Sequence, residues 1–263
     1  MNRVDKARVG AAFTRGAAAY DAHAEVQALV RRRALALARL AAPRAATVLD
    51  VGCGTGRLLA DLLAERPGLR AAGVDLAPGM CRAAALQVPA ASLAVGDAEA
   101  LPVRGGAFDL VLSTSTLQWL PRLEPAVAEL ARATRPGGGR VVLALFGERT
   151  LQELKAAWRE AAAHRAADRT HRFASADEVA RAVRAAGLNL DRLEEAEHLE
   201  RHPDARAVLR ALKAIGAQGA APGAAGLAGR RVTLEALRRY DERHGGPDGV
   251  PVTWHVVYAV ASR

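Results

Sequence analysis

VLDVGCGTG, residues 48–56, joins an apolar run to an acid and then to three alternating glycines. This pattern is typical of a strand that turns tightly into a helix, and such a turn brings backbone N–H groups close to a ligand. Val74-Asp75 follows about one strand–helix–strand unit later, at the spacing where a carboxylate meets ribose hydroxyls. Together the glycine turn and the second acid predict a site for a cofactor that contains a nucleoside.

Charge narrows the choice of cofactor. A dinucleotide fingerprint leaves its glycine loop free of acids, so that pyrophosphate can sit on the helix N-terminus. Here Asp50 lies directly before the loop. A carboxylate at this position repels phosphate but attracts an ammonium group, directly or through water. S-adenosylmethionine carries an ammonium group and no phosphate. The expected cofactor-binding residues are Asp50, Gly52, Gly54, Gly56, Asp75, Leu76, Asp97, Ala98 and Ser113.

The rest of the chain alternates strands and helices, which predicts an α/β fold with a doubly wound, mostly parallel sheet and helices on both faces. Residues 3–42 have helical periodicity and precede the first strand. The core elements expected next are strand 46–51, helix 56–66, strand 69–75, helix 79–87, strand 91–95, strand 108–113, helix 122–134 and strand 139–146. Beyond Phe146 we expect helices at 148–166, 175–186, 203–215 and 231–243, with strands at 189–199 and 252–261.

Composition excludes several classes of protein. The 263 residues are 51% apolar, but no uninterrupted apolar segment approaches the ~20 residues that a membrane helix needs. Charged residues around Lys6 and Arg8, with no apolar signal segment, argue against secretion. Cys53 and Cys81 form no disulfide or metal pattern. We therefore expect a cytoplasmic protein without membrane contact.

The formal net charge of +9 has two interpretations. Only three lysines occur, so arginine carries nearly all of the charge, as biased base composition would give. The alternative is an acidic partner, such as a carrier protein or a nucleic acid. Aromatic residues are too few and scattered for a base-stacking platform, so no nucleic-acid partner is expected. His198 and His202 are four residues apart but lack a third ligand, and no metal is expected.

The ordered strand–loop–helix units over residues 45–146 resemble the class I S-adenosylmethionine-dependent methyltransferases. Further motifs, which span nearly the whole chain, resemble the malonyl-acyl carrier protein O-methyltransferases of biotin synthesis. These motifs are Ala11-Ala12-Phe13, AAYDAHA at 18–24, Leu117-Gln118-Trp119, LQEL at 151–154, Trp158, His171-Arg172-Phe173, LKAIGA at 212–217 and PVTWH at 251–255. Two departures fall where the substrate would bind: residues 113–116 read STST where the family often has an Asn after the serine, and Trp254 replaces a usual Tyr.

The resemblance implies one domain over residues 1–263. Its implied parts are an N-terminal helical cover at 1–44, a cofactor-binding core at 45–147, helical lid insertions at 148–187 and 203–246 over the cofactor mouth, and final sheet strands at 188–200 and 250–263. The implied reaction is methyl transfer from S-adenosylmethionine to the free carboxylate of malonyl-acyl carrier protein, or of malonyl-coenzyme A. The methyl ester would prime pimeloyl synthesis for biotin. No stable protein partner is implied.

The substrate site is predicted from the chemistry together with the resemblance. Methyl transfer from a sulfonium is a direct displacement, so the protein must mainly hold the acceptor in line. An ionised carboxylate needs no general base, but an arginine is suited to hold it. Tyr20 and Arg172 are therefore the expected catalytic residues, although each also fits an ordinary half-buried tyrosine or solvated arginine. The expected substrate-binding residues are Gln118, Trp119, Arg149 and Lys213.

Three other functions remain compatible with these motifs. A related methyltransferase acting on another small carboxylic acid would keep every cofactor motif and change the lid. An assembly factor or hydroxylase of respiratory complex I with a methyltransferase-like fold would bind a protein subunit instead. A binding module could retain the cofactor and transfer nothing.

Overall fold

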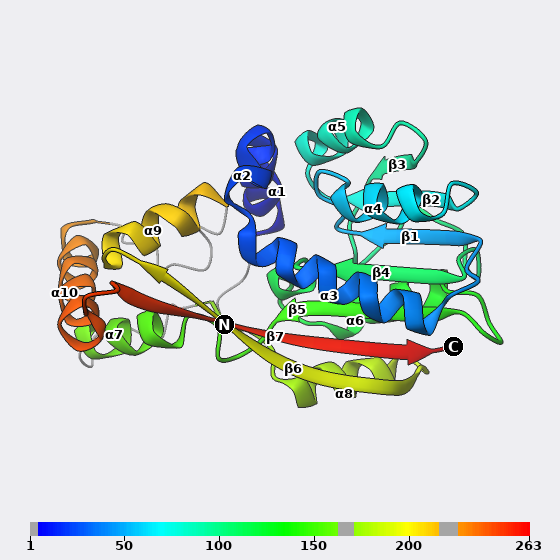
Figure 1. Cartoon of the computed structure of the whole chain (residues 1–263). Coiled ribbons are helices and arrows are strands. Elements are labelled where there is room, and N and C mark those ends of the chain that lie inside the picture. The colour runs from blue at the N-terminus through cyan, green and yellow to red at the C-terminus, as the bar shows by residue number, and fades with distance from the viewer. Residues whose placement is uncertain (1–4, 163–170, 216–225) are drawn as a thin grey trace.

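The structure, a computed structural model, describes residues 5–162, 171–215 and 226–263. Within these residues, one seven-stranded sheet has the order β3-β2-β1-β4-β5-β7-β6 (Figure 1). The first five strands in this order pair in parallel, whereas β7 is antiparallel to both β5 and β6. The strands are β1 (Thr47–Val51), β2 (Arg70–Asp75), β3 (Ser92–Val95), β4 (Leu110–Thr114), β5 (Arg140–Phe146), β6 (Asn189–His202) and β7 (Val250–Ser262). The expected α/β fold with a mostly parallel sheet is confirmed.

Helices flank this sheet at both faces and beyond its end. Each helix and strand expected from the sequence forms close to its expected place. The helices are α1 (Lys6–Gly16), η1 (Ala17–Ala19), α2 (Tyr20–His23), α3 (Glu25–Ala41), α4 (Arg57–Glu65), α5 (Pro78–Gln87), η2 (Leu117–Trp119), α6 (Glu124–Ala133), α7 (Gln152–Ala162), α8 (Ala176–Ala185), α9 (Ala205–Ala214) and α10 (Gly226–His244). The end of expected helix 148–166 lies outside the described residues, as does part of the expected lid 203–246.

Alternate residues of the central strands enter two separate cores, one on each face of the sheet. On β5, Val142 and Ala144 belong to the first core, and Val141 and Leu143 belong to the second. This division follows from the two-residue repeat of a strand. Helices α3 and α4 pack into the first core, and α6 and α8 pack into the second. Burial on both faces is why these strands read as nearly continuous apolar runs.

β6 and β7 form a ribbon that extends past the end of β5. The pairing of β5 with β7 stops at Phe146 and Val256, whereas the pairing of β6 with β7 continues to His202 and Val250. Helices α7, α9 and α10 gather around this projecting end of the ribbon (Figure 1, left). The ribbon therefore carries a helical layer that is separate from the two faces of the sheet.

Helix α8 differs from the lid expected over 148–187. Its apolar residues Val179, Ala182 and Val183 are buried in the second core, beside α6 and the sheet. Ser175 begins the helix with a capping box, because its side chain accepts from the Glu178 N–H and Glu178 reciprocates. Helix α8 is thus part of the wall that supports the sheet and does not cover the cofactor mouth.

The N-terminal helical segment is divided into α1, η1, α2 and α3. Helix α3 buries Val26, Val30 and Ala34 on the first face of the sheet. The chain bends at Ala24, whose backbone leaves the helical region before α3 begins. As a result α1 stands away from the sheet face and packs instead against α5.

The first core makes a simple stability prediction. Leu59 lies on α4 behind the glycine turn and is 0% exposed, whereas Leu86 on α5 is 88% exposed. Leu59→Ala should lower the free energy of unfolding by about 2–5 kcal/mol, because it removes buried methylenes and leaves a cavity. Leu86→Ala, the matched control, should change that free energy by less than about 0.5 kcal/mol. Urea denaturation of both variants checks this, and equal effects would contradict the assignment of the core.

Candidate active site

A cavity lies at the carboxyl ends of the parallel strands, where the order of connection reverses between β1 and β4. Open sheets of this kind bind ligands at such a point. The cavity encloses about 780 Å³ of space, its open mouth included. Its floor comes from the strand ends, and α1 contributes Lys6, Val9, Gly10 and Phe13 as a roof. The expected residues Gly52, Gly54, Asp75, Leu76, Asp97 and Ala98 all line it.

The glycine turn has the predicted shape, but its N–H groups donate hydrogen bonds within the protein. Gly52 has φ +77°, and a methyl group there would overlap the side chain of Thr116. Gly54 has φ +55° and nothing within 4 Å of the place where its side chain would be. The Gly52 N–H donates to Val74 O at 2.7 Å, and the Gly54 N–H donates to Asp75 Oδ2 at 2.9 Å. These two groups are therefore not aimed at a phosphate, which agrees with the charge argument above.

Asp75 is fixed at the centre of the cavity floor. Its Oδ2 accepts from the Gly54 N–H, and its Oδ1 accepts from the Ala77 N–H at 2.8 Å. Burial raises the pKa of this carboxyl, and the two N–H bonds oppose that rise. Each carboxylate oxygen has a further lone pair, so a pair of ribose hydroxyls can still donate to it.

Asp50 is a buried acid without a partner. Its side chain is 1% exposed, and its Oδ1 has no hydrogen bond among the described residues. Burial, with a further contribution from Asp75, raises its pKa to about 7. Val51 and Gly52, which follow it directly, line the cavity. An unpaired buried acid is unfavourable unless a cation or donor reaches it, and the ammonium group of S-adenosylmethionine fits this requirement.

Asp97 is already engaged by a residue that the sequence reasoning did not single out. Its Oδ2 accepts from Lys6 Nζ at 2.7 Å, and Lys6 also bonds to Glu99. Although burial works against it, the Lys6 bond together with the Glu99 N–H holds the pKa of Asp97 below its usual value. Lys6 thus ties α1 across the cavity. The sequence offered only the charge of Lys6 as a signal. Its partner Asp97 is too distant in the sequence for the pair to form a local motif.

Ser113 and Gly56 support the cavity from behind and do not line it. The Ser113 hydroxyl donates to Val51 O at 2.9 Å and joins β4 to β1. Its neighbours Thr114, Ser115 and Thr116 line the cavity in its place. Gly56, with φ +85°, lets helix α4 begin close to α5.

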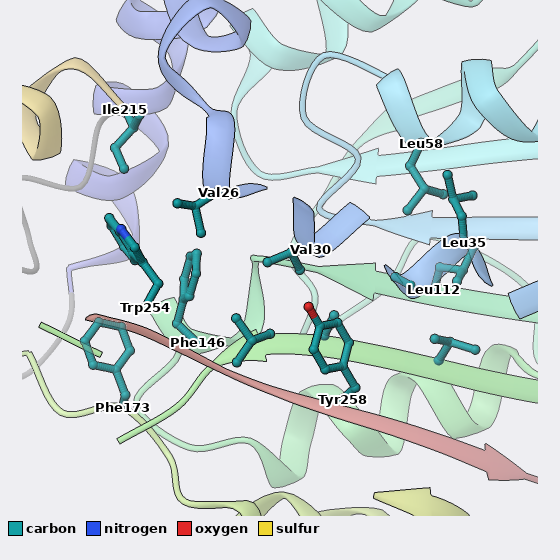
Figure 2. Packing of buried hydrophobic residues seen from close by; sticks show 14 of the residues in the cluster. Val26, Val30, Leu35, Leu58, Leu112, Phe146, Phe173, Ile215, Trp254 and Tyr258 are labelled. Carbon is teal, nitrogen blue, oxygen red and sulfur yellow. The ribbon is translucent and has the colours of Figure 1, made fainter. Parts of the chain in front are cut away.

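A second cavity of about 370 Å³ adjoins the first. Apart from Gln27, Ser115 and Gln118, its walls are apolar or aromatic. Figure 2 shows four of the lining residues, Phe146, Phe173, Ile215 and Trp254, in one part of the hydrophobic core. Four residues line both cavities, so the two spaces meet at them: Phe13, Tyr20, Ser115 and Trp119. Phe13 makes edge contacts with the rings of Tyr20 and Trp119, which keeps this junction apolar.

Tyr20 is held at the junction by the residue after it. Asp21 accepts from the Thr55 hydroxyl at 2.8 Å and from Arg57 Nε at 2.9 Å, which fixes α2 over the glycine turn. Burial, then Asp75 and Asp21, raise the pKa of Tyr20. Its hydroxyl therefore stays protonated near neutral pH and is available as a donor.

The structure separates the expected substrate residues into two groups. Tyr20 and Trp119 line both cavities, and Gln118 lines the second. Arg149, Arg172 and Lys213 line neither cavity. Their sequence neighbours Phe173 and Leu212 line the second cavity instead.

Two of the three expected cations are paired with carboxylates. Arg172 has a side chain that is 78% exposed, and it bonds to Glu178 Oε1 at 2.5 Å. Arg149 Nε bonds to Glu197 Oε1 at 2.6 Å, and its guanidinium also reaches Glu195. Lys213 is exposed on α9. The segments that contain these cations reach the second cavity, but the side chains that line it from them are apolar.

His171 is a further residue that the sequence reasoning did not assign. Its Nε2 lies 2.6 Å from the backbone oxygen of Gln118, and its ring packs against Trp119 and Phe173. Burial lowers the pKa of His171, so the ring is neutral near pH 7 and donates from Nε2. This bond joins η2 to the segment that carries Phe173. The only sign of this role in the sequence was the position of His171 in the His-Arg-Phe motif.

The chain has relatives over its whole length. A family model described as a methyltransferase domain matches residues 49–142. The malonyl-acyl-carrier protein O-methyltransferase of Geobacter sulfurreducens is 46% identical over 99% of this chain and 100% of its own length. A protein of the same name from Hahella chejuensis is 36% identical over 99% of this chain and 91% of its own length.

The chain belongs to the malonyl-acyl-carrier protein O-methyltransferase family. The expected resemblance, the enzyme class and S-adenosylmethionine as cofactor are thereby confirmed. Solved structures agree on the fold. A methyltransferase from Bacillus halodurans has a TM-score of 0.59 at 16% identity, over 87% of this chain and 97% of that one. One from Thermotoga maritima has a TM-score of 0.55 at 16% identity, over 97% and 99%.

The described residues contain no group of three or more His, Cys, Asp or Glu side chains placed to hold a metal ion. None of their helices has the length and apolar character needed to cross a membrane. In this member of the malonyl-acyl-carrier protein O-methyltransferase family, the acids of the first cavity are the residues whose substitution should affect cofactor binding.

Asp50→Asn should separate stability from cofactor binding. With its pKa raised to about 7, Asp50 destabilises the cofactor-free fold least while it is protonated, and its destabilising effect grows as pH rises toward about 7 and the buried carboxyl ionises. The free energy of unfolding of the wild type, relative to the Asn variant, should therefore fall between pH 5 and pH 8. Urea denaturation across this range checks the slope. Calorimetry at pH 8 should show S-adenosylmethionine binding weakened at least about tenfold, because a charged partner is lost. Equal pH slopes would contradict the assignment.

Lys6→Met should release the roof of the cavity. Loss of the bonds to Asp97 and Glu99 leaves α1 held mainly by its contacts with α5. Amide hydrogen exchange over residues 9–16 should become several-fold faster, because local opening costs less free energy. Arg8→Met is the matched control, since Arg8 is exposed on the same helix and its guanidinium has no partner among the described residues. Similar exchange in the two variants would show that the ion pairs do not hold α1.

Proposed function

We propose that this chain transfers the methyl group of S-adenosylmethionine to the free carboxylate of malonyl-acyl carrier protein. The observation that carries the proposal is the junction at which the acid-lined cavity meets the apolar one, through four shared residues. A donor in the first space and an acceptor in the second would face each other there. The names of the relatives supply the acceptor, because they are malonyl-acyl-carrier protein O-methyltransferases over nearly the whole chain. These names do not favour the two alternatives, which are a respiratory assembly factor and a methyltransferase that acts on another small acid.

The chain's own part in this reaction is placement. Bound S-adenosylmethionine supplies an electrophilic methyl group. Asp50, Asp75 and Asp97 would bind the cofactor's ammonium, ribose and adenine groups, as their partners and burial allow. Tyr20 donates from its hydroxyl at the junction, and the rings of Phe13 and Trp119 exclude water there. No base is needed, because a carboxyl group with a pKa of about 4 is already ionised.

Methylation would change what the malonyl group can enter. An ionised carboxylate costs several kcal/mol or more to bury, whereas its methyl ester can enter the apolar tunnel of a chain-elongating synthase. One relative, 35% identical over 98% of this chain and half of its own length, is a biotin biosynthesis bifunctional protein from Cellvibrio japonicus. That name supports an ester that primes pimeloyl synthesis for biotin. The free thiols of Cys53 and Cys81 support a reducing, cytoplasmic location.

Intact mass spectrometry tests this function. The purified protein with S-adenosylmethionine should add one methyl group to malonyl-acyl carrier protein and none to acetyl-acyl carrier protein, which lacks the free carboxylate. Asp75→Asn, which weakens the cofactor site, should lose the product. Methylation of both carrier proteins, or of neither while S-adenosylmethionine still binds, would contradict a malonyl carboxylate as the acceptor.

Competition between two thioesters tests the carrier. With malonyl-coenzyme A added in excess over malonyl-acyl carrier protein, unchanged methylation of the protein would identify the carrier protein as the substrate. Strong competition would show that the malonyl thioester alone is recognised.

A further inference from the structure

We infer that the side-chain amide of Gln118 holds the acceptor's carboxylate in the second cavity, and that no arginine or lysine of the described residues does so. This inference rests on the proposed function and assigns the recognition of its substrate. It begins with two polar atoms that the fold leaves without partners.

Among the described residues that line the two cavities, Gln118 is the one whose side-chain polar atoms are all buried and unpaired. It is 3% exposed, and both Nε2 and Oε1 lack hydrogen bonds. Its backbone oxygen, by contrast, is bonded to His171. Buried amides in native proteins are nearly always hydrogen-bonded, because a buried polar group without a hydrogen bond is costly in free energy. Since Gln118 lines the second cavity, a ligand in that cavity would supply the missing partner.

The described wall of the second cavity offers no cation to a carboxylate, which differs from the arginine expected from the sequence. None of the described residues that line the second cavity is a lysine, an arginine or a histidine. Lys155 does not line the cavity: its Nζ lies 4.5 Å from the centroid of the Phe173 ring and donates to Glu148 O at 3.1 Å. Among the described residues, a carboxylate in this cavity therefore meets neutral donors, which are the hydroxyls of Tyr20 and Ser115 and the amides of Gln27 and Gln118. Of these polar groups, only the Gln118 amide is fully buried and unpaired.

Neutral donors suit a nucleophile better than a guanidinium does. A bidentate arginine would bind a carboxylate strongly and withdraw its electron density before transfer. An amide donates one or two ordinary hydrogen bonds, which orient the carboxylate and leave it reactive. An acyl group without a carboxylate would leave the buried amide unpaired, and such sites discriminate strongly against a substrate that lacks the matching group.

The backbone around the cavity supports a functional rather than a packing role. Two non-glycine residues in the described chain have positive φ, Ser115 at 52° and Leu151 at 57°, and both line this cavity. For a leucine this conformation is a true outlier. Strained residues of this kind persist where the surrounding structure imposes them, and they cluster at ligand sites.

Three substitutions of Gln118 test the inference by steady-state methylation of malonyl-acyl carrier protein. Gln118→Met keeps the shape and removes the amide, so kcat/KM should fall on the order of 100-fold. Gln118→Glu keeps the shape and adds a negative charge, so its loss should be larger. Gln118→Asn keeps a shorter amide, so its loss should be smaller. Gln87→Met, on the exposed surface of α5, is the matched control and should match the wild type.

Two readouts separate recognition from folding. The Kd of Gln118→Met for S-adenosylmethionine should remain within about twofold of the wild type, because the amide lies outside the cofactor cavity. Its Tm should be equal or higher, because the substitution removes an unpaired buried amide. A Tm or cofactor affinity that falls in parallel with activity would assign Gln118 a structural role and overturn the inference.

Arg172→Ala tests the rival clamp directly. If it abolishes use of malonyl-acyl carrier protein while Gln118→Met retains wild-type kcat/KM, a cation holds the carboxylate and the inference is wrong. Failure of the proposed function is a separate result. In that case the wild type itself transfers no methyl group to malonyl-acyl carrier protein, and the inference falls with it.

Discussion

An acid buried without a partner at the end of the first strand is the constraint around which this protein is arranged. Asp50 is enclosed because β1 is central in the sheet, and the Gly52 turn after it closes on Thr116. Nothing in the described chain neutralises it, so the fold alone is left with an unfavourable group. The same feature that weakens the cofactor-free protein would favour a ligand with a positive charge over one with a phosphate. In this proposal, one carboxylate affects both stability and selectivity.

The cofactor half of the site could be predicted from the sequence because its signals are local. Gly52, Gly54, Asp75 and Asp97 follow directly from strand ends, and parallel strands bring such ends to one edge. Lys6 could not be paired with Asp97 in advance, since an ion pair across ninety-one positions leaves no local pattern. Ser113 was expected to line the cavity, but the lining begins one residue later, at Thr114. Ser115 adopts a positive φ, and a serine gives no sign of this in the sequence.

The acceptor half could be located but not assigned. The motifs around Arg172 and Lys213 do reach the second cavity, but a helix or loop presents only some of its residues to one side. The neighbours Phe173 and Leu212 point inward, and the cations point to solvent or to glutamates. Sequence reasoning favoured charge because a carboxylate must be bound. In the proposed arrangement, the carboxylate would be bound by neutral donors in an apolar space, chiefly by the buried and unpaired amide of Gln118.

Phe13 lies on α1 and lines both cavities, while Lys6 ties that same helix to Asp97. Any movement of α1 that admits or releases the cofactor therefore also removes part of the wall around the acceptor. The two binding events cannot be independent in such an arrangement. The cofactor would have to be seated, with α1 closed over it, before the acceptor's cavity is complete. A roof shared in this way would favour an ordered cycle, in which the cofactor binds first and is the last to leave.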